Sequence, residues 1–114
     1  MLPDAYAYNK HKALVQKYCD PAQYNFLHLN DYEITEIISE STLQDTYGID
    51  SLKTPDLMVH DVFNYDYVGE IKGRNTKDNR KKARRQVLNY SDIMTDNHIE
   101  NTPFMILDDF IKVF

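Results

Sequence analysis

Residues 54–73 read TPDLMVHDVFNYDYVGEIKG, and this stretch predicts a β-hairpin. Its two runs, 57–62 and 66–72, are rich in the β-branched and aromatic residues that favour strands. Between them stands Asn64, a residue type that is common in turns. The two runs are therefore expected to pair as antiparallel strands.

Three charged residues lie near the open end of this hairpin: Asp56, Glu70 and Lys72. Side chains alternate along a strand, so Glu70 and Lys72 point to the same face. A three-residue loop at 63–65 would place Asp56 opposite Lys72 and Met58 opposite Glu70, and opposed residues share a face. A two-residue loop would turn Asp56 to the other face, so the convergence of the three charges is a prediction about register.

Such a cluster favours one kind of chemistry. Two carboxylates a few ångströms apart repel each other unless a cation lies between them, and oxygen ligands without cysteine suit Mg²⁺ or Mn²⁺. A divalent metal can activate a bound water, and a neighbouring lysine can position or deprotonate that water. The pattern indicates phosphodiester hydrolysis. The alternative is an Asp at the start of a strand beside an ordinary surface Glu–Lys pair.

The charge of the chain is strongly divided. The formal net charge is −5, yet residues 72–85 hold eight of the 13 Lys and Arg and one of the 18 Asp and Glu. A basic segment on an otherwise acidic protein is typical of an anion-binding surface, although a solvated helix face has the same pattern. Its place directly after the hairpin favours the functional interpretation.

The remaining composition fits a single globular domain over residues 1–114. No apolar run is long enough to span a membrane, and the first residues lack the features of a secretory signal, so we expect an intracellular protein. The one cysteine, Cys19, cannot form an internal disulfide and is expected to be a small core residue.

The other elements follow from periodicity and turn residues. Their order predicts an α/β fold in which a mixed sheet is flanked by helices. The predicted elements before the hairpin are a helix over 4–18, a strand over 32–39 with a helix as the alternative, and a connection over 40–53 that has room for a helical turn and bends at Gly48. After the hairpin we predict a helix over 76–92 and a strand over 103–109, followed by a short strand or helical turn.

The motifs TPD at 54–56 and GEIKG at 69–73 resemble those of the PD-(D/E)xK nuclease superfamily. Gln86 and Tyr90 in the following helix resemble the Q-x-x-x-Y motif of its RecB-like branch, and their spacing puts them on one helix face. The resemblance covers roughly residues 32–108 and implies a restriction-endonuclease-like core of order α-β-β-β-α-β. The sub-type with an iron–sulfur cluster needs four cysteines and is excluded.

The resemblance also implies residue roles. Asp56 and Glu70 would bind Mg²⁺ or Mn²⁺ together with the backbone carbonyl of Ile71, and Lys72 would be the catalytic lysine. Gln86 and Tyr90 would steer the DNA strand or support the metal site. The basic side chains that would hold phosphates are Lys77, Arg80, Lys81, Arg84 and Arg85.

The expected function is metal-dependent hydrolysis of DNA, by an exonuclease or a structure-specific endonuclease, with RNA as the less favoured substrate. Any specificity would have to come from a homodimer or an accessory protein. The alternative is a catalytically weak module on a nuclease-derived fold that binds nucleic acid or protein. The nine tyrosines of the chain suit a protein-binding surface. An upstream metal ligand is not assigned; the residues that remain open for it are His11, Glu33, Glu36 and Glu40.

Overall fold

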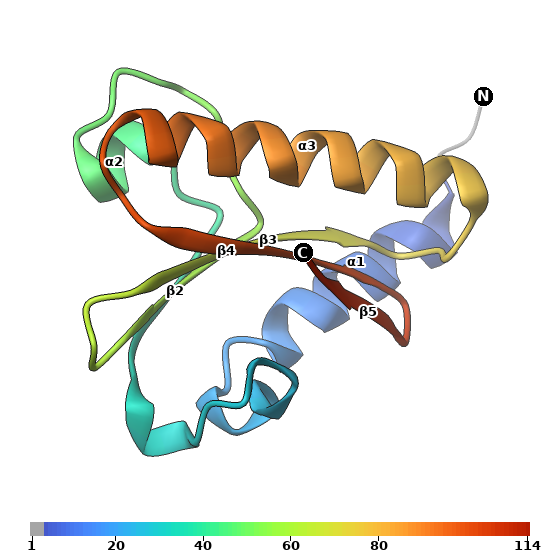
Figure 1. The fold of residues 1–114 in the computed structure, drawn as a ribbon. Coiled ribbons are helices and arrows are strands. Elements are labelled where there is room, and N and C mark those ends of the chain that lie inside the picture. The colour runs from blue at the N-terminus through green and yellow to red at the C-terminus, as the bar shows by residue number, and fades with distance from the viewer. Residues whose placement is uncertain (1–3) are drawn as a thin grey trace.

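A five-stranded mixed sheet forms the middle layer of the molecule, with a long helix on one face and the N-terminal helix on the other (Figure 1). The computed structural model describes residues 4–114. The strands are β1 (Ile34–Ser39), β2 (Leu57–Asp61), β3 (Asp66–Lys72), β4 (Asn101–Leu107) and β5 (Phe110–Val113). The helices are α1 (Ala5–Lys17), α2 (Leu43–Tyr47) and α3 (Lys77–Asp96), with short 3₁₀ turns η1 (Pro21–Gln23), η2 (Asn25–Leu27) and η3 (Asp31–Glu33).

The strands lie in the sheet in chain order, and only β3 and β4 run parallel. Parallel neighbours need a crossover connection, which α3 supplies. The helix begins after Thr76, whose side chain accepts a hydrogen bond from the N–H of Asn79. It continues to Asp96, one turn beyond the predicted 76–92, because Met94 extends the buried side of the helix.

The expected α/β architecture is confirmed at this level: the connection over 40–53 contains the short helix α2, and the end of the chain forms the strand β5 and not a helical turn. Within residues 4–114, no helix combines the length and the apolar composition that crossing a membrane requires.

The hairpin between β2 and β3 turns one residue earlier than the predicted loop at 63–65. The Asp61 N–H donates to the carbonyl of Tyr65, and the Asp61 carboxylate accepts from the N–H groups of Phe63 and Tyr65. Asn64 has φ 61°, the left-handed conformation that closes a three-residue hairpin loop. The buried carboxylate of Asp61 therefore fixes where the strand ends.

This earlier turn corrects the predicted register. Met58 pairs with Val68 and not with Glu70. Continued to the open end of the hairpin, the observed register puts Asp56 beside Glu70 and not opposite Lys72. Because the pairing moved by two residues, every side chain keeps its predicted face.

Each face of the sheet has its own apolar core. Ile71 points to the face that α1 covers, whereas Val68 points to the face that α3 covers. The core beneath α1 includes Leu14, Val15, Tyr18, Tyr24, Leu57, Val59, Phe104 and Ile106. The core beneath α3 includes Leu43, Ile49, Met58, Val87, Tyr90 and Met94.

Helix α1 comes very close to the end of β3. A Cβ atom at Gly73 would collide with the backbone of Ala7, so only glycine allows this approach. The Lys10 ammonium also lies 3.0 Å from the carboxylate of Asp108, in the turn between β4 and β5. These contacts fix α1 beside the carboxyl end of β3.

Two further expectations are wrong. The last buried strand is Asn101–Leu107 and not 103–109, because Asp108, with φ 55°, reverses the chain into β5. Cys19 is exposed and not buried, because α1 ends at Lys17 and the chain turns away from the core there.

Candidate active site

Polar side chains from α1, the hairpin and α3 meet at the carboxyl end of β3. The segment before β2 supplies a carboxylate, and β3 supplies a carboxylate and a lysine on the face that α3 covers. The structure brings together His11, Asp56, Glu70, Lys72 and Tyr90, as the following contacts and pKa shifts show.

Asp56 is held by two partners. Its Oδ2 accepts a hydrogen bond of 2.8 Å from the N–H of Ile71, and its Oδ1 lies 3.3 Å from Nε2 of His11. Burial acts to raise the Asp56 pKa, but hydrogen bonds with His11, Glu70 and the Ile71 N–H together lower it. In turn, the hydrogen bond to Asp56 raises the pKa of His11. The Asp56 carboxylate is therefore ionised in the folded protein at neutral pH.

Glu70 has the opposite character. It is only 5% exposed, and its Oε2 atom is buried without a hydrogen-bond partner among the described residues. Burial, followed by the neighbouring Asp56, raises the Glu70 pKa far above its usual range, whereas Lys72 and Tyr90 lower it by less. When the pKa values of two adjacent carboxyl groups shift in opposite directions, the pair holds one proton. A bound cation can take the place of that proton.

The oxygens at this site fit a divalent metal ion. In a strand, the N–H and the carbonyl of one residue face the same side, so the Ile71 carbonyl faces the side on which its N–H meets Asp56. Two carboxylates and a carbonyl are hard ligands of the kind that Mg²⁺ and Mn²⁺ take. Among residues 4–114, no three His, Cys, Asp or Glu side chains are placed to hold a metal by themselves. The carbonyl and water would therefore complete the coordination.

Helix α3 borders the site with Tyr90, which lies against Glu70, and Gln86 lies one turn before Tyr90 on the same helix. Tyr90 is 8% exposed, and burial, followed by the neighbouring Glu70, raises the pKa of its hydroxyl. The Oε1 atom of Gln86 is buried without a hydrogen-bond partner in the described part of the chain. Like Glu70, Gln86 therefore has an acceptor oxygen that a donor or a cation could satisfy.

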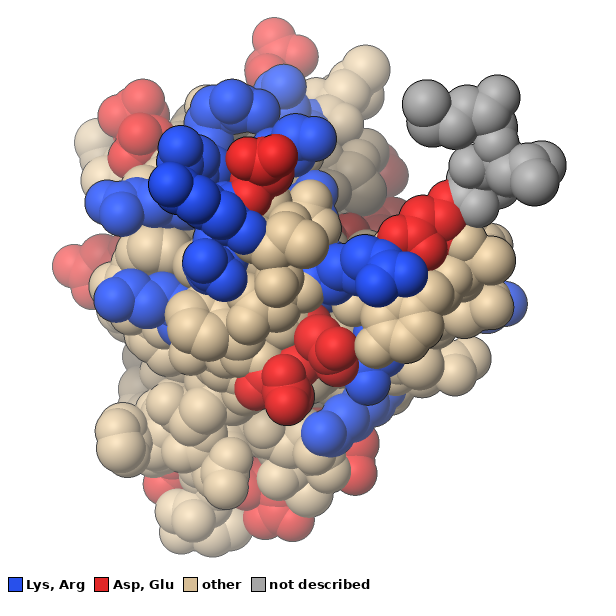
Figure 2. Space-filling view, turned by 90° about the vertical axis from the view of Figure 1, so that its right-hand side faces the viewer, with Lys and Arg blue, Asp and Glu red and all other residues tan. Residues whose placement is uncertain are grey.

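The basic side chains of α3 lie around the helix and not on one face. Figure 2 shows them at the top of the molecule, over the N-terminal half of α3, with acidic side chains below. The Arg84 guanidinium lies 5.7 Å from the ring centroid of Phe114, on the flank towards β5. Lys82, one turn before Gln86, is exposed on the flank of α3 opposite Arg84.

Five of these side chains were expected to hold phosphates. They remain solvent-facing: Arg80 is half-buried, and Lys77, Lys81, Arg84 and Arg85 are exposed. Lys82 was not among these five, although its four-residue spacing from Gln86 puts it on the same helix face.

Two of the four open candidates for an upstream ligand lie near the site. His11 contacts Asp56, and the N–H of Glu40 donates to the Asp56 carbonyl at 3.4 Å. Glu36 lies on β1 opposite His60 of β2, and Glu33 belongs to η3. These positions leave His11 and Glu40 as the upstream residues that could take part.

The chemistry of this site has to be judged from its own geometry. No protein-family model, no curated protein and no solved structure matches the chain. That geometry is a pair of carboxyl groups from the hairpin with His11 from the first helix beside them, and Tyr90 from α3 against one of them.

Proposed function

We propose that this protein is a metal-dependent nuclease that hydrolyses phosphodiester bonds in DNA, on a restriction-endonuclease-like core. The observation that carries the proposal is the buried, unpaired Oε2 of Glu70 next to the ionised Asp56. A buried acceptor without a donor is costly, and a dication between the two carboxylates would remove that cost. Lys72 lies on the same face, two residues from Glu70.

Asp56, Glu70 and the Ile71 carbonyl would hold Mg²⁺ or Mn²⁺. When bound, the metal would supply an activated water and stabilise negative charge on the phosphoryl oxygens. Lys72 orients the attacking water, accepts its proton or offsets phosphate charge. Gln86 and Tyr90 border the site from α3 and support Glu70 or orient the strand.

The basic residues of α3 supply the long-range attraction for the substrate. Lysine and arginine contacts to phosphates release counterions, so binding weakens steeply with added salt. Substituting both Arg84 and Arg85 by glutamate is expected to weaken DNA binding and to flatten the salt dependence of that binding. The full set comprises Lys77, Arg80, Lys81, Lys82, Arg84 and Arg85.

The test uses a Lys72→Ala variant and, as a matched control, Lys112→Ala, because Lys112 is an exposed lysine on β5. Labelled single-stranded, duplex and four-way DNA are incubated with Mn²⁺ or Mg²⁺. The wild-type protein and the Lys112 variant are expected to cleave, with activity lost in EDTA. Lys72→Ala is expected to lose cleavage by about 10²-fold or more with an unchanged melting temperature. Full activity in that variant would overturn the assignment.

A second candidate is a nucleic-acid-binding or protein-interaction module without catalysis. It is favoured by the contacts of Asp56, whose two oxygens are already bonded to Ile71 and His11 as in a structural residue. Under this alternative the protein binds labelled DNA in EDTA as well as in Mn²⁺ and cleaves none. Asp56→Asn would then lower stability without changing DNA affinity.

A further inference from the structure

A second concave site lies at the other end of the same sheet face. A cavity of about 440 Å³ opens between α2 and strands β1 to β3. It is lined by Asp66 at the start of β3, four residues before Glu70, which corresponds to roughly 13 Å along the strand. None of the residues that the sequence motifs pointed to in the candidate active site lines it.

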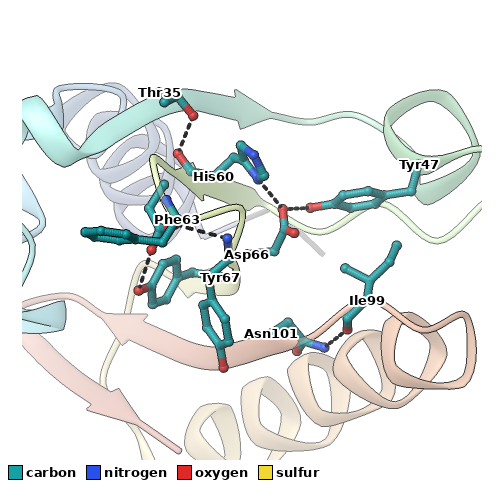
Figure 3. A network of polar contacts seen from close by, with 10 residues as sticks. Thr35, Tyr47, His60, Phe63, Asp66, Tyr67, Ile99 and Asn101 are labelled. Atoms are coloured by element: carbon teal, nitrogen blue, oxygen red, sulfur yellow. Dashed lines mark hydrogen bonds and ion pairs between the residues drawn. The ribbon is translucent and has the colours of Figure 1, made fainter.

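Asp66 is the most buried charged residue that lines this cavity. Figure 3 shows its carboxyl group between His60, from β2, and Tyr47, from α2. Its Oδ1 accepts from the Tyr47 hydroxyl at 2.7 Å and lies 3.2 Å from Nδ1 of His60. Its side chain is 9% exposed, and its Oδ2 has no hydrogen bond with any residue from 4 to 114. This oxygen is accessible from the cavity, so a ligand that brings an N–H donor can reach it.

Two more acceptors lie beside Asp66 in the same row. Glu36, His60 and Asp66 are paired neighbours on β1, β2 and β3, so their side chains share one face. Nδ1 of His60 faces Asp66 Oδ1, and in the tautomer that donates to Asp66 from Nδ1 the Nε2 atom is an acceptor. The row thus offers carboxylate, imidazole and carboxylate acceptors.

The rest of the lining defines the ligand further. No Lys or Arg lines the cavity within the described residues, and Asp45 adds a third carboxylate. Ile38 and Met58 provide apolar surface next to these acceptors. Within residues 4–114, these carboxylates and the imidazole are not placed as a metal-binding group. The complement of this lining is an organic cation with several N–H donors and a short apolar stem.

We propose that this cavity binds a small organic cation, a guanidinium or primary ammonium group on an alkyl stem. Its N–H groups donate to Asp66 Oδ2 and Glu36, and its stem packs on Met58. The volume suits such a ligand, since small-molecule sites are typically about 300–1,000 Å³. A guanidinium can bridge two carboxylates with paired hydrogen bonds. The site is independent of the proposed nuclease function.

The test is an amide NMR titration of the full chain at pH 7.5 with agmatine, which carries both a guanidinium and an ammonium group. Saturable shifts are expected at residues 41–47 and at His60 and Asp66. N-butylurea, a neutral molecule of similar shape, is the control ligand and is expected not to bind. Glu36→Gln, at an exposed position, is expected to weaken agmatine binding by about tenfold. Glu100→Gln, an exposed acid outside the cavity, is expected to leave it unchanged.

Two outcomes would overturn the proposal: the absence of saturable shifts with agmatine, or equal affinities for agmatine and N-butylurea. Equal weakening in the Glu36 and Glu100 variants would also overturn it, because the attraction would then be general and not local. An arginine-containing tripeptide distinguishes the source of the cation. Tighter binding of the tripeptide assigns the cavity to a protein side chain, and tighter binding of agmatine assigns it to free amines.

Discussion

Glu70 is a carboxyl group whose surroundings favour its protonated form. Burial and the adjacent Asp56 raise its pKa to about 9, well above the ordinary value that it has in the unfolded chain. Its contribution to stability is therefore complete below the unfolded pKa and is lost as the pH rises towards 9. The contribution of His11 to stability also falls as the pH rises, because the hydrogen bond to Asp56 raises the His11 pKa.

We predict that the metal-free protein loses stability as the pH rises from 5.5 to 9 and that Glu70→Gln flattens this loss. Glutamine has the shape of the protonated side chain and cannot ionise, so the residual slope belongs to His11. One proton of difference between the folded and unfolded states corresponds to at most about 1.4 kcal/mol per pH unit. Urea unfolding in EDTA across this range measures it. Parallel curves for the two proteins would mean that Glu70 ionises normally in the fold.

Sequence reasoning reached the residues of the hairpin but not the partner from α1. The two-residue alternation of strands sufficed to place Asp56, Glu70 and Lys72 on one face. The contact between His11 and Asp56 joins residues 45 positions apart, and no local pattern reports it. The four upstream candidates could therefore be separated only in three dimensions.

At the scale of elements, the fit between α1 and the end of β3 depends on Gly73. A methyl group there would meet the Ala7 backbone, which cannot rotate away as a side chain can. We predict that Gly73→Ala costs about 1–3 kcal/mol of unfolding free energy, as overpacking does, and displaces His11 from Asp56. Urea denaturation measures the first effect, and the pH titration of the His11 imidazole by NMR measures the second.

Gly48→Ala is the control, since nothing lies within 4 Å of its Cβ position, although its φ of 69° makes alanine strained there. Its cost should be about 1 kcal/mol, with an unchanged His11 titration. If Gly73→Ala also left that titration unchanged, α1 would not be positioned by this contact.

The position of each basic residue around α3 gives it a different expected effect. Lys82 lies on the flank of Gln86, whereas Arg84 lies against Phe114 on the other flank. We predict that Lys82→Ala lowers the cleavage efficiency more than Arg84→Ala, although each removes one charge and lowers the salt slope of binding by about 0.9. Binding isotherms at several salt concentrations, together with kcat/KM, separate the two effects. Equal losses of kcat/KM in the Lys82 and Arg84 variants would mean that the position of a basic residue around α3 does not affect cleavage.

The elements themselves were largely predictable, and the errors lie at their ends. The period of the apolar residues and the turn residues located the hairpin and both long helices within a few residues. The exact turn was not predictable, because it depends on Asp61 bonding to the N–H groups of Phe63 and Tyr65. A side chain that replaces backbone partners in this way is not visible in hydrophobic periodicity.

In the whole molecule, two polar sites occupy opposite ends of one sheet face, with the apolar side chains of Met58 and Val68 between them. On the face that α3 covers, β3 carries Asp66 at its first residue and Glu70 and Lys72 at its other end. The first of these sites was not predicted, because its lining comes from β1, α2, β2 and β3 and contains no motif. Only the packing of α2 against the sheet creates it.

Metal binding should stabilise the whole fold if the carboxyl pair holds a dication. A ligand that binds only the folded state adds about 2.7 kcal/mol at a concentration 100 times its dissociation constant. We predict that Mn²⁺ raises the melting temperature of the wild-type protein in a saturable manner and that EDTA reverses the rise. In Glu70→Gln the rise should be lost, because an amide replaces the buried carboxylate, whereas in Glu100→Gln, at an exposed acid, it should persist. Scanning fluorimetry of the three proteins over a Mn²⁺ series measures these shifts. An equal rise in melting temperature in all three would place the metal elsewhere on this acidic chain. Asp56 and Glu70 would then be a buried carboxyl pair that shares a proton and binds no dication.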